Sequence, residues 1–404
     1  MTVKERFLKY VSFYTTSDED SETVPSTARQ KALGQYIADE LNAMGVAAEM
    51  DDKGYVYGWL PPSPDKTNED AIGFIAHVDT APDAPGDDIH PKSVVYQGGD
   101  IPLSDTEAIR AEAFECLAKY VGQELIVTDG ATLLGADDKA GVAEIVTAVE
   151  YLNAHPEVSH RGVAVCFTPD EEIGHGAALL DLARFGAQLA YTVDGGTPGE
   201  IEYENFNAAS VKVAVKGVNI HPGSAKNKMK NAALLACEFV SRLPAAEAPA
   251  HTEGYEGFYH LCEMKGDESN AALKWIVRDH DREKFERRKA FMQKLTDYMN
   301  EVYGGGFTLT LKDSYYNMRE LIEDGHMDLI ENAKAAFEKA GVTPKIVAIR
   351  GGTDGAMLTY KGPPCPNLSV GGENFHGVHE FACVEDMETM VRVIVRLASD
   401  DEEG

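Results

Sequence analysis

Three short apolar segments of this sequence each end in acidic or histidine side chains, and this pattern limits the folds open to the chain. Apolar runs without alternation are typical of strands that are covered on both faces of a sheet. In open α/β sheets, ligands bind outside the carboxyl ends of the strands. The three runs, with the polar residues that follow them, are 71–76 before His77 and Asp79, 163–168 before Asp170, Glu171 and Glu172, and 189–193 before Asp194.

Helical segments alternate with these strands, which predicts an α/β fold with helices on both faces of a sheet. In the segment 28–45, for example, Leu33, Ile37 and Leu41 recur at helical spacing before Gly45. The other segments predicted in this part of the chain are strands at 54–60 and 345–349, and helices at about 140–152, 177–185, 327–340 and 386–398.

The pattern changes at residue 209, where Val211, Val213 and Val215 alternate with other residues. Such alternation is typical of a sheet with one solvated face. The predicted element order is βαββαβ, that of a small ferredoxin-like unit. We therefore predict an inserted α+β lid domain at 209–312 within a catalytic α/β domain formed by 1–208 and 313–404. The segments of the insert are a strand from about 209, a helix at 231–243, an extended segment at 255–263, a strand at 274–278, a helix at 282–303 and a strand at 307–311.

Composition excludes several kinds of partner. The 404 residues contain 37 basic and 67 acidic side chains, a net charge of −30, so nucleic-acid phosphates and anionic membranes would be repelled. No apolar run approaches the ~20 residues that span a bilayer. The six cysteines form no C-x-x-C pair, and the segment MTVKERFLKYVSFY lacks the pattern of a signal peptide. We expect a cytoplasmic protein.

The polar strand ends predict a metal site if they converge on one edge of the sheet. Asp137-Asp138, before the helix at about 140–152, and the segment 371–380 add further candidates. Clustered carboxylates repel one another, so a cation is their natural counter-charge. Two imidazoles with at least three carboxylates exceed the needs of one tetrahedral ion, but suit two ions about 3.5–4 Å apart that share a carboxylate. Zinc is the leading choice for these ligands, with cobalt or manganese as substitutes.

Each motif also has a purely structural explanation when it is taken alone. Asp137-Asp138 can cap the helix that begins near Lys139, and the acidic triplet after the strand 163–168 can be a solvated turn. His376 and His379 can be ordinary surface histidines. The coincidence of all these groups at strand ends is what favours a metal site.

The motifs resemble those of the dinuclear zinc exopeptidases, the family that includes aminoacylase and bacterial dipeptidases. Within this family the chain is most similar to the tripeptide-cleaving aminopeptidases, and the resemblance covers nearly the whole chain. The motifs that carry it are AHVDT at 76–80, LGADDKAG at 134–141, TPDEEIG at 168–174, VDGG at 193–196 and NFHGVHE at 374–380.

The resemblance implies two zinc ions with five protein ligands. It also implies that one carboxylate bridges both ions. The implied ligands are Asp137 as the bridge, His77 and Asp194 on one ion, and Glu172 and His376 on the other.

Two further residues receive catalytic roles from the same resemblance. Asp79 would orient His77 through its second ring nitrogen, and Glu171 would be the general base that takes a proton from water and delivers it to the departing amine. His376 is favoured over His379 as the ligand, because the family spacing places an acid four residues later and Glu380 satisfies it.

Three residues are candidates for substrate binding, and two of them, His221 and Arg278, lie in the predicted inserted domain. The segment around His221 resembles one whose histidine reaches a substrate carbonyl, although Pro222 can equally fix this histidine in a plain turn. Arg278 and Arg350 are candidates for holding the substrate's terminal carboxylate, and a buried ion pair is the alternative for each. The family resemblance also allows a homodimer through this domain, since the corresponding domain of relatives often mediates dimerisation.

The predicted function is removal of the N-terminal residue from tripeptides, with small peptides as substrates. A dipeptidase or an N-acyl-amino-acid deacylase would share the metal centre and differ in its pocket. A catalytically silent binding or scaffold protein is an alternative of another class. Such a protein would have lost a ligand or the base, and neither is lost here.

Overall fold

The computed structural model describes residues 1–399, which belong to two compact units. The first unit comprises Met1–Tyr203, Glu320–Val347 and the chain from Thr353 onward, and the second comprises Glu204–Arg319 with Ala348–Gly352. The second unit thus begins at 204 and ends at 319, where the sequence suggested 209 and 312, and it includes a short later segment.

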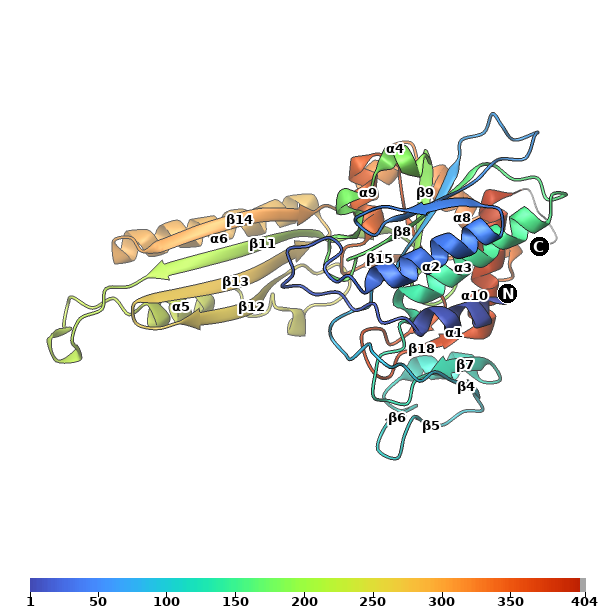
Figure 1. Ribbon diagram of the computed structural model, residues 1–404. Helices are drawn as coiled ribbons and strands as arrows, with labels where there is room; N and C mark the ends of the chain where they lie inside the picture. The colour runs from blue at the N-terminus through green and yellow to red at the C-terminus, as the bar shows by residue number, and fades with distance from the viewer. Residues whose placement is uncertain (400–404) are drawn as a thin grey trace. The chain divides into compact units, whose positions relative to one another are not determined.

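A mixed sheet forms the centre of the first unit (Figure 1). Its middle strands β8, β3 and β9 are parallel, and β2 joins β8 in the antiparallel direction. The strand order among the described residues is β1 (Ala47–Met50), β2 (Val56–Leu60), β8 (Val163–Thr168), β3 (Ile72–His77), β9 (Leu189–Gly195), β16 (Asn367–Ser369), β10 (Glu200–Asn205) and β15 (Lys345–Ile349).

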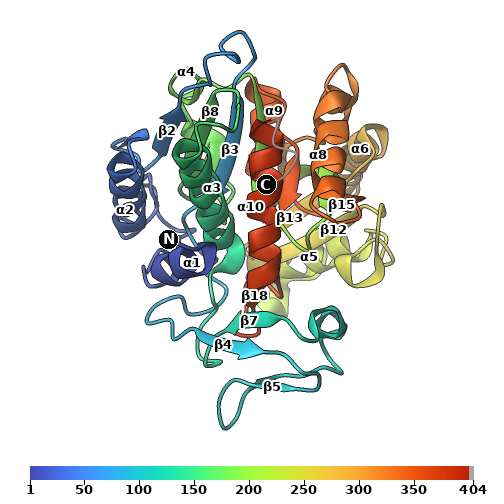
Figure 2. The ribbon, with the colours of Figure 1, turned by 90° about the vertical axis from the view of Figure 1, so that its right-hand side faces the viewer.

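Helices cover both faces of this sheet because its central strands are apolar on both sides. Every residue of β3 and β8 is buried. Figure 2 shows α3 and α10 in front of the sheet, whereas α4 and α9 pack on its other face around Phe185 and Leu358. The α/β prediction is confirmed. The helices of this unit are α1 (Val3–Val11), α2 (Gln30–Ala43), α3 (Ala136–Ala154), α4 (Leu182–Phe185), α8 (Met327–Lys339), α9 (Asp354–Lys361) and α10 (Val384–Ala398), and α7 (Arg319–Glu323) begins at the boundary between the units.

The helix predicted at 177–185 is wrong. The chain forms a 3-10 turn at Gly176–Leu179 and then the separate short helix α4. Asp181 lies between them in an extended conformation, and its carboxylate accepts hydrogen bonds from the N–H groups of Ala183 and Arg184. This cap begins a new helix, so the first turn does not continue.

Smaller strands place the late histidine motif next to the start of α3. The segment 374–380 joins β17 to β18, and β18 pairs with β7. These strands form a sheet in the order β17 (Gly372–Glu373), β18 (Phe381–Cys383), β7 (Glu124–Val127) and β4 (Lys92–Val95), beside the pair β5 (Ile101–Pro102) and β6 (Ala108–Ile109) and the 3-10 helix Glu115–Tyr120.

The second unit has the predicted ferredoxin-like βαββαβ order, and α5 and α6 lie along its sheet (Figure 1). Val211, Val213 and Val215 face the core together with Phe239 of α5 and Met292 of α6. Its elements are β11 (Asn207–Lys216), α5 (Ala232–Ser241), β12 (Phe258–Gly266), β13 (Asn270–Asp279), α6 (Arg282–Tyr303) and β14 (Phe307–Tyr315), in the sheet order β12-β13-β11-β14, with 3-10 turns at Pro222–Ser224 and Pro249–His251.

No helix among residues 1–399 is long and apolar enough to cross a membrane. The six cysteines are all free thiols.

A buried carboxyl on α3 gives a stability prediction. Neither oxygen of Glu144 has a hydrogen-bond partner among the described residues, and burial raises the pKa of this carboxyl well above its usual range. The folded state therefore holds a proton that the unfolded chain releases above about pH 4.3, so stability falls as pH rises through that window. Glu144→Met should raise the free energy of unfolding by about 1–3 kcal/mol at pH 8, and by less at pH 4.

Calorimetric melting of the variant and the parent protein at both pH values checks this expectation. Glu338→Met, which removes an exposed carboxylate from α8, is the matched control and should change stability by less than about 0.5 kcal/mol. An equal gain for Glu144→Met at both pH values would contradict the assignment of the effect to ionisation.

Candidate metal centre

Parallel strand ends bring the predicted ligands together. β3 ends at His77, which is in register with Thr168 at the end of β8, and β9 carries Asp194 near its end on the other side of β3. Glu172 follows β8 in the next turn. These side chains therefore meet at the carboxyl edge of the sheet.

Asp137 lies between the two predicted histidine ligands. One carboxylate oxygen is 2.9 Å from Nε2 of His77, and the other is 3.2 Å from Nε2 of His376. Asp137 lies at the start of α3 with non-helical backbone angles. The helix cap considered from the sequence does not form, since the Asp137 carboxylate faces the imidazoles. A carboxylate with one oxygen towards each side is suited to bridge two cations.

Each side of Asp137 has a further carboxylate. Asp194 Oδ1 lies 3.5 Å from Nε2 of His77, and Glu172 Oε2 lies 3.0 Å from Nε2 of His376. The structure thus brings all five predicted ligands into one cluster. Two sets in the described part of the chain have potential ligand atoms within 4.8 Å of one another, namely His77 with Asp137 and Glu172, and His77 with Asp138 and Asp194.

Asp138 is close to the cluster although it is outside the predicted ligand set. Its Oδ2 accepts a hydrogen bond from the backbone N–H of His77 at 3.1 Å, and its Oδ1 is buried with no partner in the described residues. The sequence placed Asp138 beside Asp137 among the candidates for the metal site, and the family resemblance did not include it in the five ligands.

Electrostatics make the cluster strongly attractive to cations. Burial raises the pKa of Asp194 to about 6, and burial together with Asp137 raises the pKa of Glu172 to about 7. Hydrogen bonds with Asp137 and then Glu172 raise the pKa of His376 to about 11. The raised pKa values mean that protons bind these groups tightly, because protonation offsets the crowded negative charges. Divalent cations would offset the same charges in place of the protons. The donor set of imidazoles and carboxylates fits zinc.

Asp79 contacts both His77 at the end of β3 and the turn after β8. Its side chain lies 3.3 Å from Nδ1 of His77, and its two oxygens accept hydrogen bonds from the N–H groups of Glu171 and Glu172. Nδ1 of His77 also contacts the Asp79 carbonyl oxygen at 3.1 Å. The contacts with the turn after β8 were not indicated by the sequence, and the orienting role of Asp79 stays a prediction.

Asp79→Asn should lower the affinity for a divalent metal ion by about 10–100-fold, because it weakens the group that contacts a candidate ligand. Titration with a divalent metal ion measures the effect. Asp83→Asn is the matched control, since Asp83 lies 3.5 Å from Nδ1 of His376 but its side chain is 64% exposed. Equal losses in both variants would argue against the special position of Asp79.

Glu171, the predicted base, lies beside the cluster in the turn after β8. Burial raises the pKa of its carboxyl well above the usual range, and the nearby Asp194 adds to this effect. A raised pKa makes a carboxylate a better proton acceptor near neutral pH.

Two buried acids outside the predicted ligand set bind backbone and side-chain groups next to the site. Glu380 accepts hydrogen bonds from the N–H groups of Leu134, Gly135 and Asp137, so it fixes the loop that presents the bridging carboxylate. Asp354 accepts from the hydroxyl of Thr168 at 2.8 Å and from the N–H of Ala177. In the sequence, Glu380 served only to favour His376 over His379 as the ligand, and no role was predicted for Asp354.

Asp170, the first acid of the triplet, faces away from the cluster. Its carboxylate accepts hydrogen bonds from the N–H and hydroxyl of Ser26 and from the side chain of Gln30. His379 lies near Glu107 and against Phe114. His175 is exposed.

The three predicted substrate-binding residues belong to the second unit. His221 is exposed and its Nδ1 accepts a hydrogen bond from the N–H of Gly223. Arg350 donates to the backbone of the segment 252–256, which occupies much of its guanidinium. Arg278 donates to the Arg350 carbonyl, and its Nε has no partner among residues 1–399.

The mixed α/β sheet gathers imidazoles and carboxylates at its strand ends, around the carboxylate of Asp137. This combination of fold and site defines a metallohydrolase. Comparison with known proteins makes this more specific. The model of the Peptidase family M20/M25/M40 matches residues 128–400. Peptidase T of Halothermothrix orenii is 51% identical over 400 residues, which cover 98% of each sequence. The chain belongs to the Peptidase family M20/M25/M40, and the predicted family resemblance is confirmed.

Solved structures share the fold. Aminopeptidase PepT from Bacillus cereus has a TM-score of 0.77 at 24% identity, covering 98% of this chain and 97% of that one. A dinuclear metal-binding M20 peptidase from Bacillus subtilis has a TM-score of 0.64 at 15% identity, covering 98% and 97%. These likenesses confirm the predicted fold, a mixed sheet flanked by helices with an additional α+β unit.

Proposed function

We propose that the protein is a two-zinc aminopeptidase that removes the N-terminal residue from tripeptides. The observation that carries this proposal is the Asp137 carboxylate, whose two oxygens face His77 and His376. The 51% identity to Peptidase T over nearly the whole chain supports the substrate class.

The ligand assignment follows the geometry of the cluster. His77 and Asp194 would hold one zinc ion, Glu172 and His376 the other, and Asp137 would contact both. When bound, the ions would lower the pKa of a water molecule and polarise the scissile carbonyl. Asp138 fixes the backbone of His77 and is better suited to support than to ligation.

Glu171 would move the proton. Its backbone N–H is held by Asp79, and its side chain lies in the same turn as Glu172. As general base it accepts a proton from the attacking water, and it then donates this proton to the nitrogen of the departing amine. Enclosure from bulk water keeps its carboxylate basic enough for this task.

The second unit would supply substrate contacts. We assign the terminal carboxylate of the peptide to Arg278 in preference to Arg350, because the Arg350 guanidinium already donates to the segment 252–256. His221 stays a candidate for the substrate carbonyl. Homodimerisation through this unit and a cytoplasmic location stay predictions.

A peptide panel tests the substrate class. With zinc-loaded protein, Ala-Ala-Ala should yield Ala and Ala-Ala, while Ala-Ala and N-acetyl-Ala-Ala-Ala should react with kcat/KM at least about 100-fold lower, the size of effect expected when a buried recognition group loses its partner. Faster cleavage of Ala-Ala would favour a dipeptidase, and release of acetate would favour a deacylase. Hydrolysis of none of the three would revive the scaffold alternative.

A further inference from the structure

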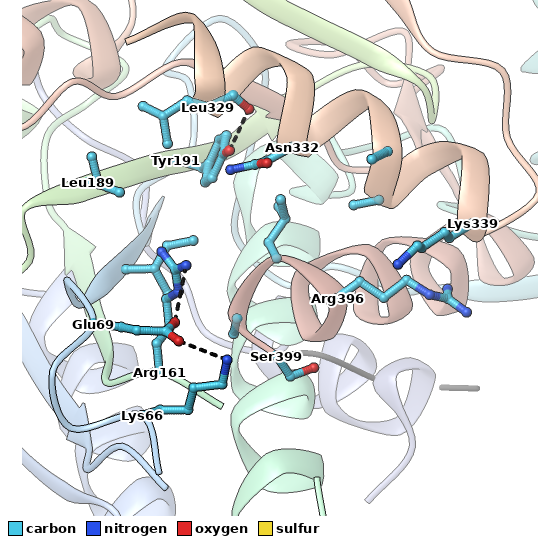
Figure 3. A pocket seen from close by; sticks show the side chains of 15 residues that line it. Lys66, Glu69, Arg161, Leu189, Tyr191, Leu329, Asn332, Lys339, Arg396 and Ser399 are labelled. Atoms are coloured by element: carbon cyan, nitrogen blue, oxygen red, sulfur yellow. Dashed lines mark hydrogen bonds and ion pairs between the residues drawn. The ribbon is translucent and has the colours of Figure 1, made fainter. Parts of the chain in front are cut away.

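A cavity of about 220 Å³ lies in the first unit, beside the large sheet (Figure 3). One wall is formed by Ile72 at the start of β3 and by Leu189 and Tyr191 at the start of β9. Asp194 follows Leu189 by five residues on β9, which at about 3.3 Å per residue separates them by roughly 16 Å. The cavity is therefore distinct from the metal centre.

Basic side chains dominate the charged lining of this cavity. Lys66, Arg161, Lys339 and Arg396 supply positive charges, and Glu69 is the one carboxylate among its described lining residues. Glu69 lies 2.8 Å from Lys66 and 3.5 Å from Arg161, so it is shared between them. This local excess of positive charge occurs in a chain with a net charge of −30.

Arg396 shows that the lining is incomplete without an acceptor. Its Nε and Nη1 are enclosed by protein and have no hydrogen-bond partner in the described part of the chain. An enclosed charged donor without a partner is costly, and buried polar groups normally find one. A ligand with anionic oxygens in the cavity would supply the counter-charge that this guanidinium lacks.

Helix stabilisation is the competing explanation for two of the cations. Lys339 lies in the last turn of α8 and Arg396 in the last turn of α10, where positive charge complements the helix dipole. This role accounts for one cation on each helix. It does not account for the enclosed donors of Arg396, or for Lys66 and Arg161 on other segments of the same cavity.

We propose that this cavity binds a small anion, namely a molecule with a phosphate group or two carboxylates. Guanidinium groups match the geometry of both kinds of oxyanion. The volume of 220 Å³ is below the ~300–1,000 Å³ of pockets for drug-sized ligands, so the ligand is a compact molecule. Ile72 and Leu189 would contact its apolar part.

Isothermal titration of the full-length, zinc-loaded protein with potassium sulfate and with potassium succinate, at constant ionic strength, tests the proposal. We expect one saturable site per chain. Arg396→Gln and Lys339→Gln should each bind at least about tenfold more weakly, because each removes a positive charge from the lining of the cavity. Lys294→Gln removes an exposed charge from α6 in the second unit, and this matched control should bind as the parent protein does. Melting temperature and peptide hydrolysis confirm that the variants are folded.

The chain's own end, Asp400-Asp401-Glu402-Glu403, carries the same carboxylate chemistry, so a chain shortened to residue 399 is titrated in parallel. Saturable binding in both forms supports a free small anion. If only the shortened form binds the anion, the cationic site is still supported, and the carboxylates of residues 400–403 compete with the anion for it in the full-length chain. Absence of saturable binding in both forms, or equal affinity in Arg396→Gln, Lys339→Gln and the parent protein, would overturn the proposal.

Discussion

Glu171→Gln is expected to lower kcat for tripeptide hydrolysis by about 10²–10⁴-fold while both metal ions stay bound. The amide has nearly the shape of the carboxylate, but it cannot accept the proton of the attacking water. The backbone N–H of Glu171 keeps its hydrogen bond to Asp79, so the turn that carries Glu172 is preserved. Steady-state kinetics with Ala-Ala-Ala and metal analysis of the same sample measure the two parts of this expectation.

The neighbouring residue is the matched control. Glu172→Gln removes a carboxylate that lies 3.0 Å from Nε2 of His376, so this variant should lose activity together with one metal ion. Adding excess zinc should restore part of the activity of Glu172→Gln and none of that of Glu171→Gln. A fully active Glu171→Gln variant would exclude Glu171 as the base.

Asp137→Asn is expected to release both metal ions and to reduce activity by at least about 10²-fold, the upper range for loss of a mere supporting group. Each oxygen of Asp137 faces a different imidazole, and an amide offers one neutral oxygen in their place. Metal analysis should fall from two ions per chain to below one. Because ligands that bind only the folded state stabilise it, added zinc should raise the melting temperature of the parent protein and should have much less effect on this variant.

Asp83→Asn again serves as the control, since it changes an exposed carboxylate near His376 and leaves the bridge intact. If Asp137→Asn kept two ions per chain, Asp137 would not be the bridge. Asp138, which is the other acid at the start of α3, would then be the next candidate.

The sequence was most informative where local chemistry and sheet geometry agree. The apolar run 163–168 predicts β8 with the observed bounds, and Glu171 and Glu172 in the turn after it lie at the metal cluster because β8 and β3 are parallel. Alternation at Val211, Val213 and Val215 predicts the core face of β11, because every second side chain of a strand points to the same face of the sheet.

Contacts between distant segments could not be predicted in the same way. The bonds from Asp79 to the turn after β8, and those from Glu380 to the loop before Asp137, depend on how separate elements pack. Asp181 caps α4 and thereby divides the helix predicted at 177–185. The spacing of apolar residues does not reveal this cap. The basic cavity likewise combines residues from 66 to 399 that have no common motif.

The most direct test of the two-metal centre is anomalous X-ray diffraction from crystals of the zinc-loaded protein. The predicted result is two zinc peaks about 3.5–4 Å apart, with Asp137 between them, His77 and Asp194 at one peak, and Glu172 and His376 at the other. A single peak, or two peaks that do not share Asp137, would contradict the proposed centre.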